Sequence, residues 1–288
     1  MARTEIMTNP VIVTCPNERT LELPLVYDSP HSGYDYPDDI NSIVPIEILR
    51  QTEDAFIDAL FGHVSVLGAV FLKAMFPRCY IDPNRSTEDI QVDALNGPWP
   101  GPVNNSIKVN LGAGLTFTKI QGEREIYDRK LTVVEVQHRI SAYWQPYHDA
   151  LSGELDRLHT THGQVWHINC HSMPAKGNVH SEDGPVERAD FVLGDRDGTT
   201  CAPEFTQFVA DFLIGRGYDV AINWPMKGVE LVRKHGRPDE NRHSLQIEVN
   251  RRLYMHEEEI TQNDLYPETA LVLADMNAEI ANFVRGRL

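Results

Sequence analysis

The sequence predicts an α/β fold with a mixed, largely parallel sheet flanked by helices. Two short apolar runs, 23–27 and 165–170, are each followed closely by a His-Ser pair and are typical of strands buried inside a sheet. Further apolar runs alternate along the chain with amphipathic helical patterns, which indicates a sheet covered on both faces. No linker of distinct composition divides residues 1–288, so we expect a single domain.

The remaining strands are predicted from short apolar runs bounded by turn residues. They are expected at 69–72, 78–82, 191–194, 218–223 and 245–250. In the last of these, apolar and polar residues alternate, so one face should be apolar while the other carries Gln246, Glu248 and Asn250. Residues 1–22 are expected to form an irregular entry segment or an edge hairpin.

Helices are predicted where apolar residues recur at steps of three and four. They are expected at 45–49, 52–61, 126–159, 205–213 and 267–285. Thr52 is the predicted N-cap of its helix, with Glu53 and Asp54 in the first turn, where the helix dipole favours carboxylates. Pro146 should kink or split the long helix, because proline removes a backbone donor and clashes with the preceding turn.

The overall charge argues against two classes of partner. Acidic residues outnumber basic residues by 42 to 26, so the formal net charge is −16, which disfavours non-specific binding to nucleic acid or to an anionic membrane. No apolar run approaches the ~18 residues that a membrane span needs. The start of the chain lacks the apolar core of a signal peptide, and the four cysteines are widely spaced. We therefore expect a cytoplasmic protein, either a monomer or a homo-oligomer.

His31 and His171 stand at the ends of the two strands that lead into the His-Ser pairs. Ligands of open α/β sheets bind in the crevice beyond the carboxyl ends of the strands, so both imidazoles are expected at one site. Two histidines and a carboxylate, with one coordination position left to water, make a hydrolytic zinc site. Asp54 or Glu53 is the best local candidate for the carboxylate. The alternative is that each histidine only caps its strand by hydrogen bonding.

Glu248 is the candidate proton acceptor of such a site. From the polar face of its strand it would point either to solvent at the margin of the sheet or into a polar cleft. In a cleft it could act as a general base and later donate the proton to the leaving amine.

Arg85 is the first candidate for binding an anionic substrate. It follows a predicted strand and turn, where its guanidinium could meet a carboxylate through two parallel hydrogen bonds. The alternative is a surface ion pair with Asp82 or Asp89.

Two long loops complete the predicted organisation. Residues 91–122 are rich in proline and glycine, and loops of this length are often lids or binding loops. Residues 224–244 form a second expected loop, which is basic and carries Arg233 as a further candidate for the substrate.

Eight segments of the sequence, taken together, are characteristic of one protein family. Their order and spacing are more specific for that family than any single segment is. They include Ser-Pro-His-Ser-Gly at 29–33 and Cys-His-Ser-Met-Pro at 170–174. The others lie at 53–58, 78–85, 144–151, 192–198, 235–238 and 245–251. Together they extend over most of the chain, which resembles the N-formylglutamate amidohydrolase (deformylase) family.

The resemblance implies a zinc-carboxypeptidase-like fold and a zinc-dependent amidohydrolase with one divalent metal ion. The metal ligands that it implies are His31, Asp54 and His171. It implies that Glu248 is the proton shuttle and that Arg85, preceded by Asn84, grips a substrate carboxylate. The implied substrate is a small anionic N-acyl amino acid, above all N-formyl-L-glutamate, which would be cleaved to formate and L-glutamate.

The chain departs from the family's pattern at two places. Asn169 stands where the family usually has an acidic residue, which would remove a partner that orients a ligand histidine. Gly228-Val229 replaces a paired glycine in a loop expected to close on the substrate. Two other functions stay open: an aspartoacylase-like or carboxypeptidase-like hydrolase of another N-acyl amino acid, and a metal-free binding protein on the same fold.

Overall fold

An eight-stranded sheet forms the centre of the protein. The computed structural model describes residues 6–8, 10–120 and 123–288. The strands of the sheet are β1 (Ile6–Thr8), β2 (Val11–Thr14), β3 (Leu25–Ser29), β4 (Val70–Ala74), β9 (Val165–Met173), β10 (Phe191–Gly194), β11 (Val220–Ile222) and β12 (Arg242–Asn250). Their order across the sheet is β1-β2-β4-β3-β9-β12-β10-β11. The four inner strands β4, β3, β9 and β12 run parallel, and antiparallel pairings begin at β2 and β10. The predicted α/β class is confirmed.

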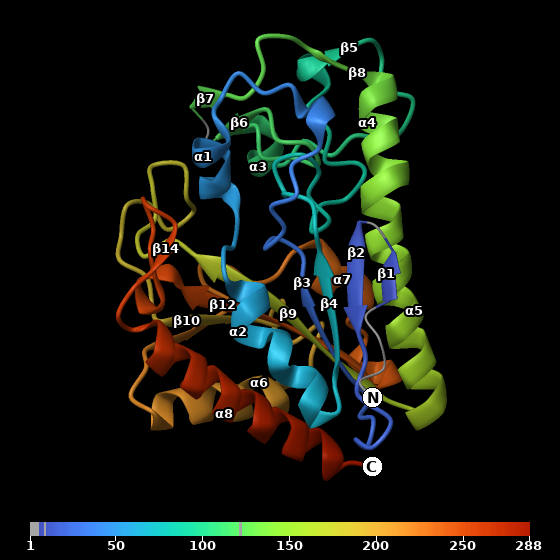
Figure 1. Cartoon of the computed structure of the whole chain (residues 1–288), viewed down its shortest axis with the longest axis vertical. Coiled ribbons are helices and arrows are strands. Elements are labelled where there is room, and N and C mark those ends of the chain that lie inside the picture. The colour runs from blue at the N-terminus through green and yellow to red at the C-terminus, as the bar shows by residue number, and fades with distance from the viewer. Residues whose placement is uncertain (1–5, 9, 121–122) are drawn as a thin grey trace.

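Helices cover both faces of the sheet (Figure 1). One face packs against α2 (Ile57–Phe61), α6 (Pro203–Gly215) and α8 (Tyr266–Arg285). The other face packs against α5 (Gln145–His162) and α7 (Glu230–His235). Apolar side chains on both sides of the inner strands are therefore withdrawn from water, which accounts for the near-continuous apolar runs in the sequence. No helix among the described residues is long and apolar enough to cross a membrane.

Shorter α-helices and strands lie between these elements. They are α1 (Ile46–Leu49), α3 (Ile107–Asn110), α4 (Val133–Arg139), β5 (Leu95–Asn96), β6 (Lys119–Ile120), β7 (Arg124–Glu125), β8 (Leu131–Thr132), β13 (Met255–His256) and β14 (Thr261–Gln262). Most of the segments between β4 and α4 lie beyond one end of the sheet (Figure 1). The predicted edge hairpin is confirmed for β1 and β2, which pair antiparallel; residues 1–5 and 9 lie outside the described residues.

The prediction of a strand at 78–82 is wrong. Its residues form a turn followed by chain without regular secondary structure, in which the Tyr80 N–H donates to the Pro77 carbonyl and the Asp82 N–H to the Leu115 carbonyl. The apolar side chains of the segment are buried against other core residues on the α5 side of the sheet. A short apolar run that is buried outside a sheet has the same pattern as a strand, so periodicity could not separate the two.

The helix predicted at 52–61 begins only at Ile57. Thr52 ends a short 3₁₀ helix and Glu53 is extended, with φ −72° and ψ 152°, so the predicted N-cap role of Thr52 is wrong. The backbone N–H of Asp54 donates to the His31 carbonyl at 3.0 Å. This bond holds Asp54 beside the end of β3 instead of in a helical turn.

The helix predicted at 126–159 begins at Val133, where Thr132 and Glu135 form a capping box. A π-helical turn over Ile140–Trp144 interrupts it just before Pro146. The rest, α5, continues to His162. The prediction of an unbroken loop at 224–244 is wrong, because α7 lies within it and β12 begins at Arg242.

Candidate metal centre

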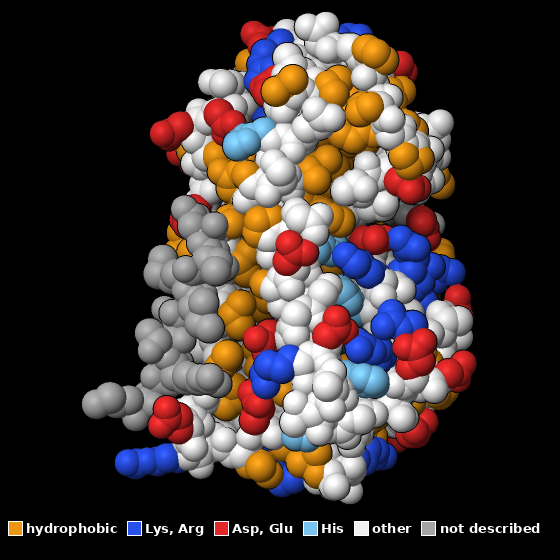
Figure 2. Space-filling view, turned by 90° about the vertical axis from the view of Figure 1, so that its right-hand side faces the viewer, with side chains coloured by type: hydrophobic (Ala, Val, Ile, Leu, Met, Phe, Trp, Pro, Cys, Tyr) orange, Lys and Arg blue, Asp and Glu red, His pale blue; other side chains and the backbone are white. Residues whose placement is uncertain are grey.

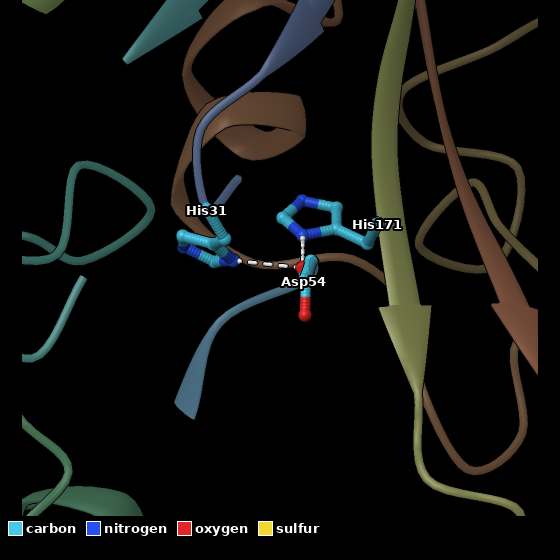
Figure 3. A group of neighbouring side chains, drawn as sticks. All are labelled: His31, Asp54 and His171. Carbon is cyan, nitrogen blue, oxygen red and sulfur yellow. Dashed lines mark hydrogen bonds and ion pairs between the residues drawn. The ribbon is translucent and has the colours of Figure 1, made fainter. Parts of the chain in front are cut away.

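Three buried side chains meet at the carboxyl edge of the inner strands. The Asp54 Oδ2 atom lies 3.2 Å from His31 Nδ1 and 3.0 Å from His171 Nδ1. Figure 3 shows His31 and His171 on either side of Asp54, each joined to it by one ring nitrogen. The candidate ligand atoms all lie within 4.8 Å of one another, and each residue is 2% exposed or less. Two imidazole nitrogens and one carboxylate oxygen are a donor set that a divalent cation such as zinc accepts.

Asp54, rather than Glu53, faces the two histidines. The Glu53 carboxylate is turned toward other partners: it accepts from Tyr36 Oη at 2.8 Å and from Arg50 Nε at 3.2 Å. Between the two carboxylates considered from the sequence, the structure brings only Asp54 into contact with His31 and His171.

The far side of His31 is held by a carboxylate. His31 Nε2 lies 2.7 Å from Asp82 Oδ1, and Arg78 Nη2 donates to Asp82 Oδ2 at 2.7 Å. Burial alone would raise the pKa of Asp82, but the charges of Arg78 and His31 hold it well below its ordinary value. Because an ionised carboxylate only accepts hydrogen bonds, His31 donates from Nε2 to Asp82, and this bond orients the ring with Nδ1 turned toward Asp54.

The far side of His171 is held by an amide. Its Nε2 lies 2.7 Å from Asn169 Oδ1, so the expectation that Asn169 removes an orienting partner is wrong. The amide oxygen accepts a hydrogen bond as a carboxylate would, although it carries no charge.

The protonation states inside the centre favour metal binding. Burial would raise the pKa of Asp54, but its hydrogen bonds with His171 and His31 hold that pKa well below its ordinary value. Burial is the largest cause that lowers the pKa of His171, and the hydrogen bond with Asp54 opposes it only in part. An ionised carboxylate and a neutral imidazole are the forms that bind a metal ion.

Glu248 is placed directly beside His171. The two residues are register partners on the parallel neighbours β12 and β9. Because β12 has a neighbour on each side, the alternative of a solvent position at the sheet margin is wrong, and Glu248 is only 8% exposed. Burial, followed by the charge of Asp54, raises its pKa to about 8. Gln246 Nε2 donates to Glu248 Oε1 at 2.9 Å and fixes that oxygen.

Arg85 is buried without a carboxylate partner among the described residues. It donates from Nε to the Ala113 carbonyl and from Nη1 to the Asn84 carbonyl, both at 3.1 Å. The two acids considered as its partners are engaged elsewhere: Asp82 with Arg78 and His31, and Asp89 with Ser86 and Asn104. The positive charge of Arg85 is thus left for another anion.

The other two predicted substrate residues already have protein partners. Asn84 Oδ1 accepts from the Leu231 N–H at 2.9 Å, and Asn84 Nδ2 lies 3.2 Å from His171 Nε2. Arg233 projects from α7 with its side chain 56% exposed and pairs with Glu230. Substrate binding by Asn84 and Arg233 stays a prediction. Figure 2 shows Lys and Arg side chains on one flank of the molecule, interspersed with His, Asp and Glu side chains.

Three residues of the centre were not assigned to it from the sequence. Arg78 and Asp82 orient His31, and Arg251 donates from Nη2 to Asp54 Oδ1 at 3.2 Å and to the Glu53 carbonyl at 2.5 Å. All three lie in segments that carry the family resemblance, which was the available signal. Their pairing depends on contacts between residues far apart in sequence.

Comparisons with known proteins agree with this arrangement. A sequence model of the family "N-formylglutamate amidohydrolase" matches residues 23–255. An N-formylglutamate deformylase of Pseudomonas putida is 28% identical over 263 residues, which are 88% of this chain and 91% of that protein. The crystal structure of an N-formylglutamate amidohydrolase from Ralstonia eutropha JMP134 aligns with a TM-score of 0.91 and 45% identity, covering 97% of this chain and 99% of that one.

A more distant protein from Agrobacterium tumefaciens, 18% identical, shares the fold with a TM-score of 0.63 over 94% of this chain and 96% of its own. The fold and the His/Asp/His centre define an amidohydrolase with a candidate metal site. The chain belongs to the N-formylglutamate amidohydrolase family.

Proposed function

We propose that this protein is a zinc-dependent amidohydrolase that cleaves a small anionic N-acyl amino acid, with N-formyl-L-glutamate as the first candidate. The observation that carries the proposal is the meeting of His31 Nδ1, His171 Nδ1 and Asp54 Oδ2 in a buried centre beside Glu248. The names of the matched relatives support the choice of acyl group and amino acid. Formate and L-glutamate would be the products.

His31, Asp54 and His171 would hold the metal ion, and the ion would polarise the scissile carbonyl and lower the pKa of a water molecule. Glu248 then accepts the proton of the attacking water and passes it to the leaving nitrogen. A pKa of about 8 would leave much of Glu248 protonated at neutral pH. A bound cation would lower that pKa toward the range a general base needs, so the metal and Glu248 depend on one another.

Substrate recognition is assigned to Arg85 in this proposal. Among the residues that the structure describes, its buried guanidinium donates to backbone carbonyls and to no carboxylate, and a carboxylate would supply the missing negative charge. The α-carboxylate of the substrate is the proposed partner. The proposed partner of Arg233 is the side-chain carboxylate of the substrate. Arg233 would first have to break its ion pair with Glu230, so its role is less direct than that of Arg85.

The decisive experiment is a substrate panel on metal-stripped protein reloaded with Zn²⁺, Co²⁺ or Mn²⁺. N-formyl and N-acetyl derivatives of Glu, Asp and His are compared by amine release. Preference for N-formyl-L-glutamate, dependent on metal, supports the proposal. Preference for an N-acetyl substrate would favour the aspartoacylase-like alternative, and a protein that binds no metal and cleaves nothing would favour the binding-protein alternative.

A cytoplasmic location is part of the proposal. The four cysteines are free and buried, as is usual in a reducing compartment.

A further inference from the structure

The segment that carries Arg85 is held by side chains of one helical stretch. Residues 80–85 belong to no strand, so their carbonyl groups receive no hydrogen bonds from a neighbour in the sheet. Three of these carbonyls are instead paired with polar side chains of α4, the π-helical turn and α5. The pairs are Arg139 Nη1 with the Tyr80 carbonyl at 3.0 Å, His148 Nε2 with the Pro83 carbonyl at 2.9 Å, and Trp144 Nε1 with the Arg85 carbonyl at 2.9 Å.

The π-helical turn over Ile140–Trp144 brings the three side chains to one side of the stretch. Arg139 and Trp144 are five residues apart, and in a regular α-helix of 3.6 residues per turn they would point in different directions. The hydrogen bonds of a π turn join residues five apart, so one turn closes between them. Trp144 and His148 are four residues apart in sequence, and their rings stack with centroids 3.7 Å apart. Each of the three residues is 8% exposed or less.

The hydrogen bonds of His148 have one consistent direction. A carbonyl oxygen can only accept, so His148 donates from Nε2 to Pro83. The ammonium group of Lys234 can only donate, and its Nζ lies 3.0 Å from His148 Nδ1. Burial, followed by the charge of Lys234, lowers the pKa of His148 to about 3, so the ring is neutral and can form both bonds.

We infer that Trp144 and His148 are positioning residues for substrate binding, because they hold the backbone from which the Arg85 guanidinium meets the substrate carboxylate. That guanidinium donates only to backbone carbonyls among the described residues, so its own contacts place it no more firmly than the backbone around it. The inference rests on the proposed role of Arg85 in binding a carboxylate.

Metal binding should be independent of these two positioning residues. Asp82, which orients His31, is held by Arg78 through its carboxylate and by the Leu115 carbonyl through its N–H. Neither contact involves Trp144 or His148. Loss of either donor should therefore change substrate binding and leave the metal content unchanged.

The first test compares zinc-loaded variants on N-formyl-L-glutamate and on the same compound with its α-carboxylate amidated. Trp144→Phe keeps an aromatic ring beside His148 and removes the N–H donor. KM for the free acid should rise about fivefold, the usual effect of losing one hydrogen bond. KM for the amide, kcat and zinc content should each change less than about twofold, because an interaction made equally before and in the transition state alters KM alone.

His148 allows a loss and a rescue at one position. His148→Leu removes the donor to Pro83 and should also raise KM for the free acid about fivefold. His148→Gln retains an N–H donor and should bring KM to within about twofold of the unsubstituted protein. Trp166→Phe is the matched control, since Trp166 is equally buried and donates to Gln164 Oε1 at 3.2 Å, but its ring packs on the opposite face of the sheet. It should leave KM unchanged.

A second measurement needs no substrate and separates this inference from the proposed function. Exchange of the Arg85 Nε–H with solvent, followed in ¹H–¹⁵N spectra of the zinc-loaded protein, reports how firmly the guanidinium is held against the Ala113 carbonyl. The exchange should be about fivefold faster in Trp144→Phe and in His148→Leu, and unchanged in Trp166→Phe.

Four outcomes would overturn the inference. They are an unchanged KM for the free acid in Trp144→Phe, an equal rise in KM for the acid and the amide, an equal rise in Trp166→Phe, or an unchanged exchange rate of the Arg85 Nε–H in Trp144→Phe. If circular dichroism shows that His148→Leu does not fold, Trp144→Phe and His148→Gln decide. An unsubstituted protein that binds zinc but cleaves neither compound would contradict the proposed substrate alone, and the exchange rates would then decide the inference.

Discussion

Asp82 Oδ1 lies 2.7 Å from His31 Nε2, although 51 residues separate the two in sequence. The contact turns the Nδ1 face of His31 toward Asp54 and His171. It also brings negative charge to the far side of a candidate ligand, which raises the basicity of the imidazole.

Asp82→Asn should weaken metal binding about 10- to 100-fold while the fold persists, because the amide can still accept a hydrogen bond but has no charge. Titration with Co²⁺ against a chelator measures the change. Asp89→Asn is the control, since Asp89 is also buried but bonds Ser86 and Asn104 and not a histidine. Equal losses in the two variants would show that the effect is not specific to His31.

His31→Ala and His171→Ala should each abolish stoichiometric binding of zinc and hydrolysis, because each removes one of three donors. Asp54→Ala should do the same, whereas Glu53→Ala should retain the metal because Glu53 bonds Tyr36 and Arg50. Metal content after dialysis is the measurement. Full occupancy in His171→Ala, or loss in Glu53→Ala alone, would contradict the assignment.

Glu248→Gln should keep the metal and lose about 10²- to 10⁴-fold in turnover, since it preserves shape and removes the proton acceptor. Steady-state kinetics on metal-loaded protein, with metal content measured on the same sample, checks this. Turnover close to that of the unsubstituted enzyme would exclude Glu248 as the general base.

Arg85→Lys should lower kcat/KM for the free acid of the substrate and leave metal content unchanged. Lysine retains the charge, but it lacks the planar fork that binds a carboxylate through two hydrogen bonds. The control is a substrate whose α-carboxylate is amidated. If the variant slows the acid and the amide by the same factor, Arg85 does not bind that carboxylate.

Glu135→Gln should lower the free energy of unfolding by about 0.5 kcal/mol at pH 7, the usual contribution of a partly exposed ion pair, because glutamine can still close the capping box with Thr132 but cannot form the ion pair with Arg129. The hydrogen bond from Arg129, followed by those at the Thr132 cap, lowers the pKa of Glu135 to about 2. Because the folded-state pKa lies below the unfolded value of 4.5, the stabilising effect is fully present above pH 4.5.

The stabilising effect of the Glu135 charge is lost as the pH falls through the folded-state pKa of about 2. Urea unfolding at pH 7 and at pH 3 measures the change, and the difference between the variant and the unsubstituted protein should shrink at the lower pH. A difference that does not depend on pH would exclude the charge of Glu135 as its cause.

Local patterns in the sequence determined much of the fold. The buried strands β3 and β9 and the helices α6 and α8 were predictable because each has an apolar run or stripe that only burial explains. The same patterns placed His31 and His171 at strand ends, and parallel strands bring such ends to one edge. The prediction of a single domain stays a prediction.

The tertiary structure decided which polar residues complete the centre. The sequence left Asp54 and Glu53 open and assigned the first turn of a helix to both, whereas the hydrogen bond from Asp54 N–H to the His31 carbonyl places only Asp54 between the histidines. Asp82 contacts His31 across 51 residues of sequence. Periodicity describes how a segment faces its immediate surroundings, so it cannot determine contacts that exist only once the strands have paired.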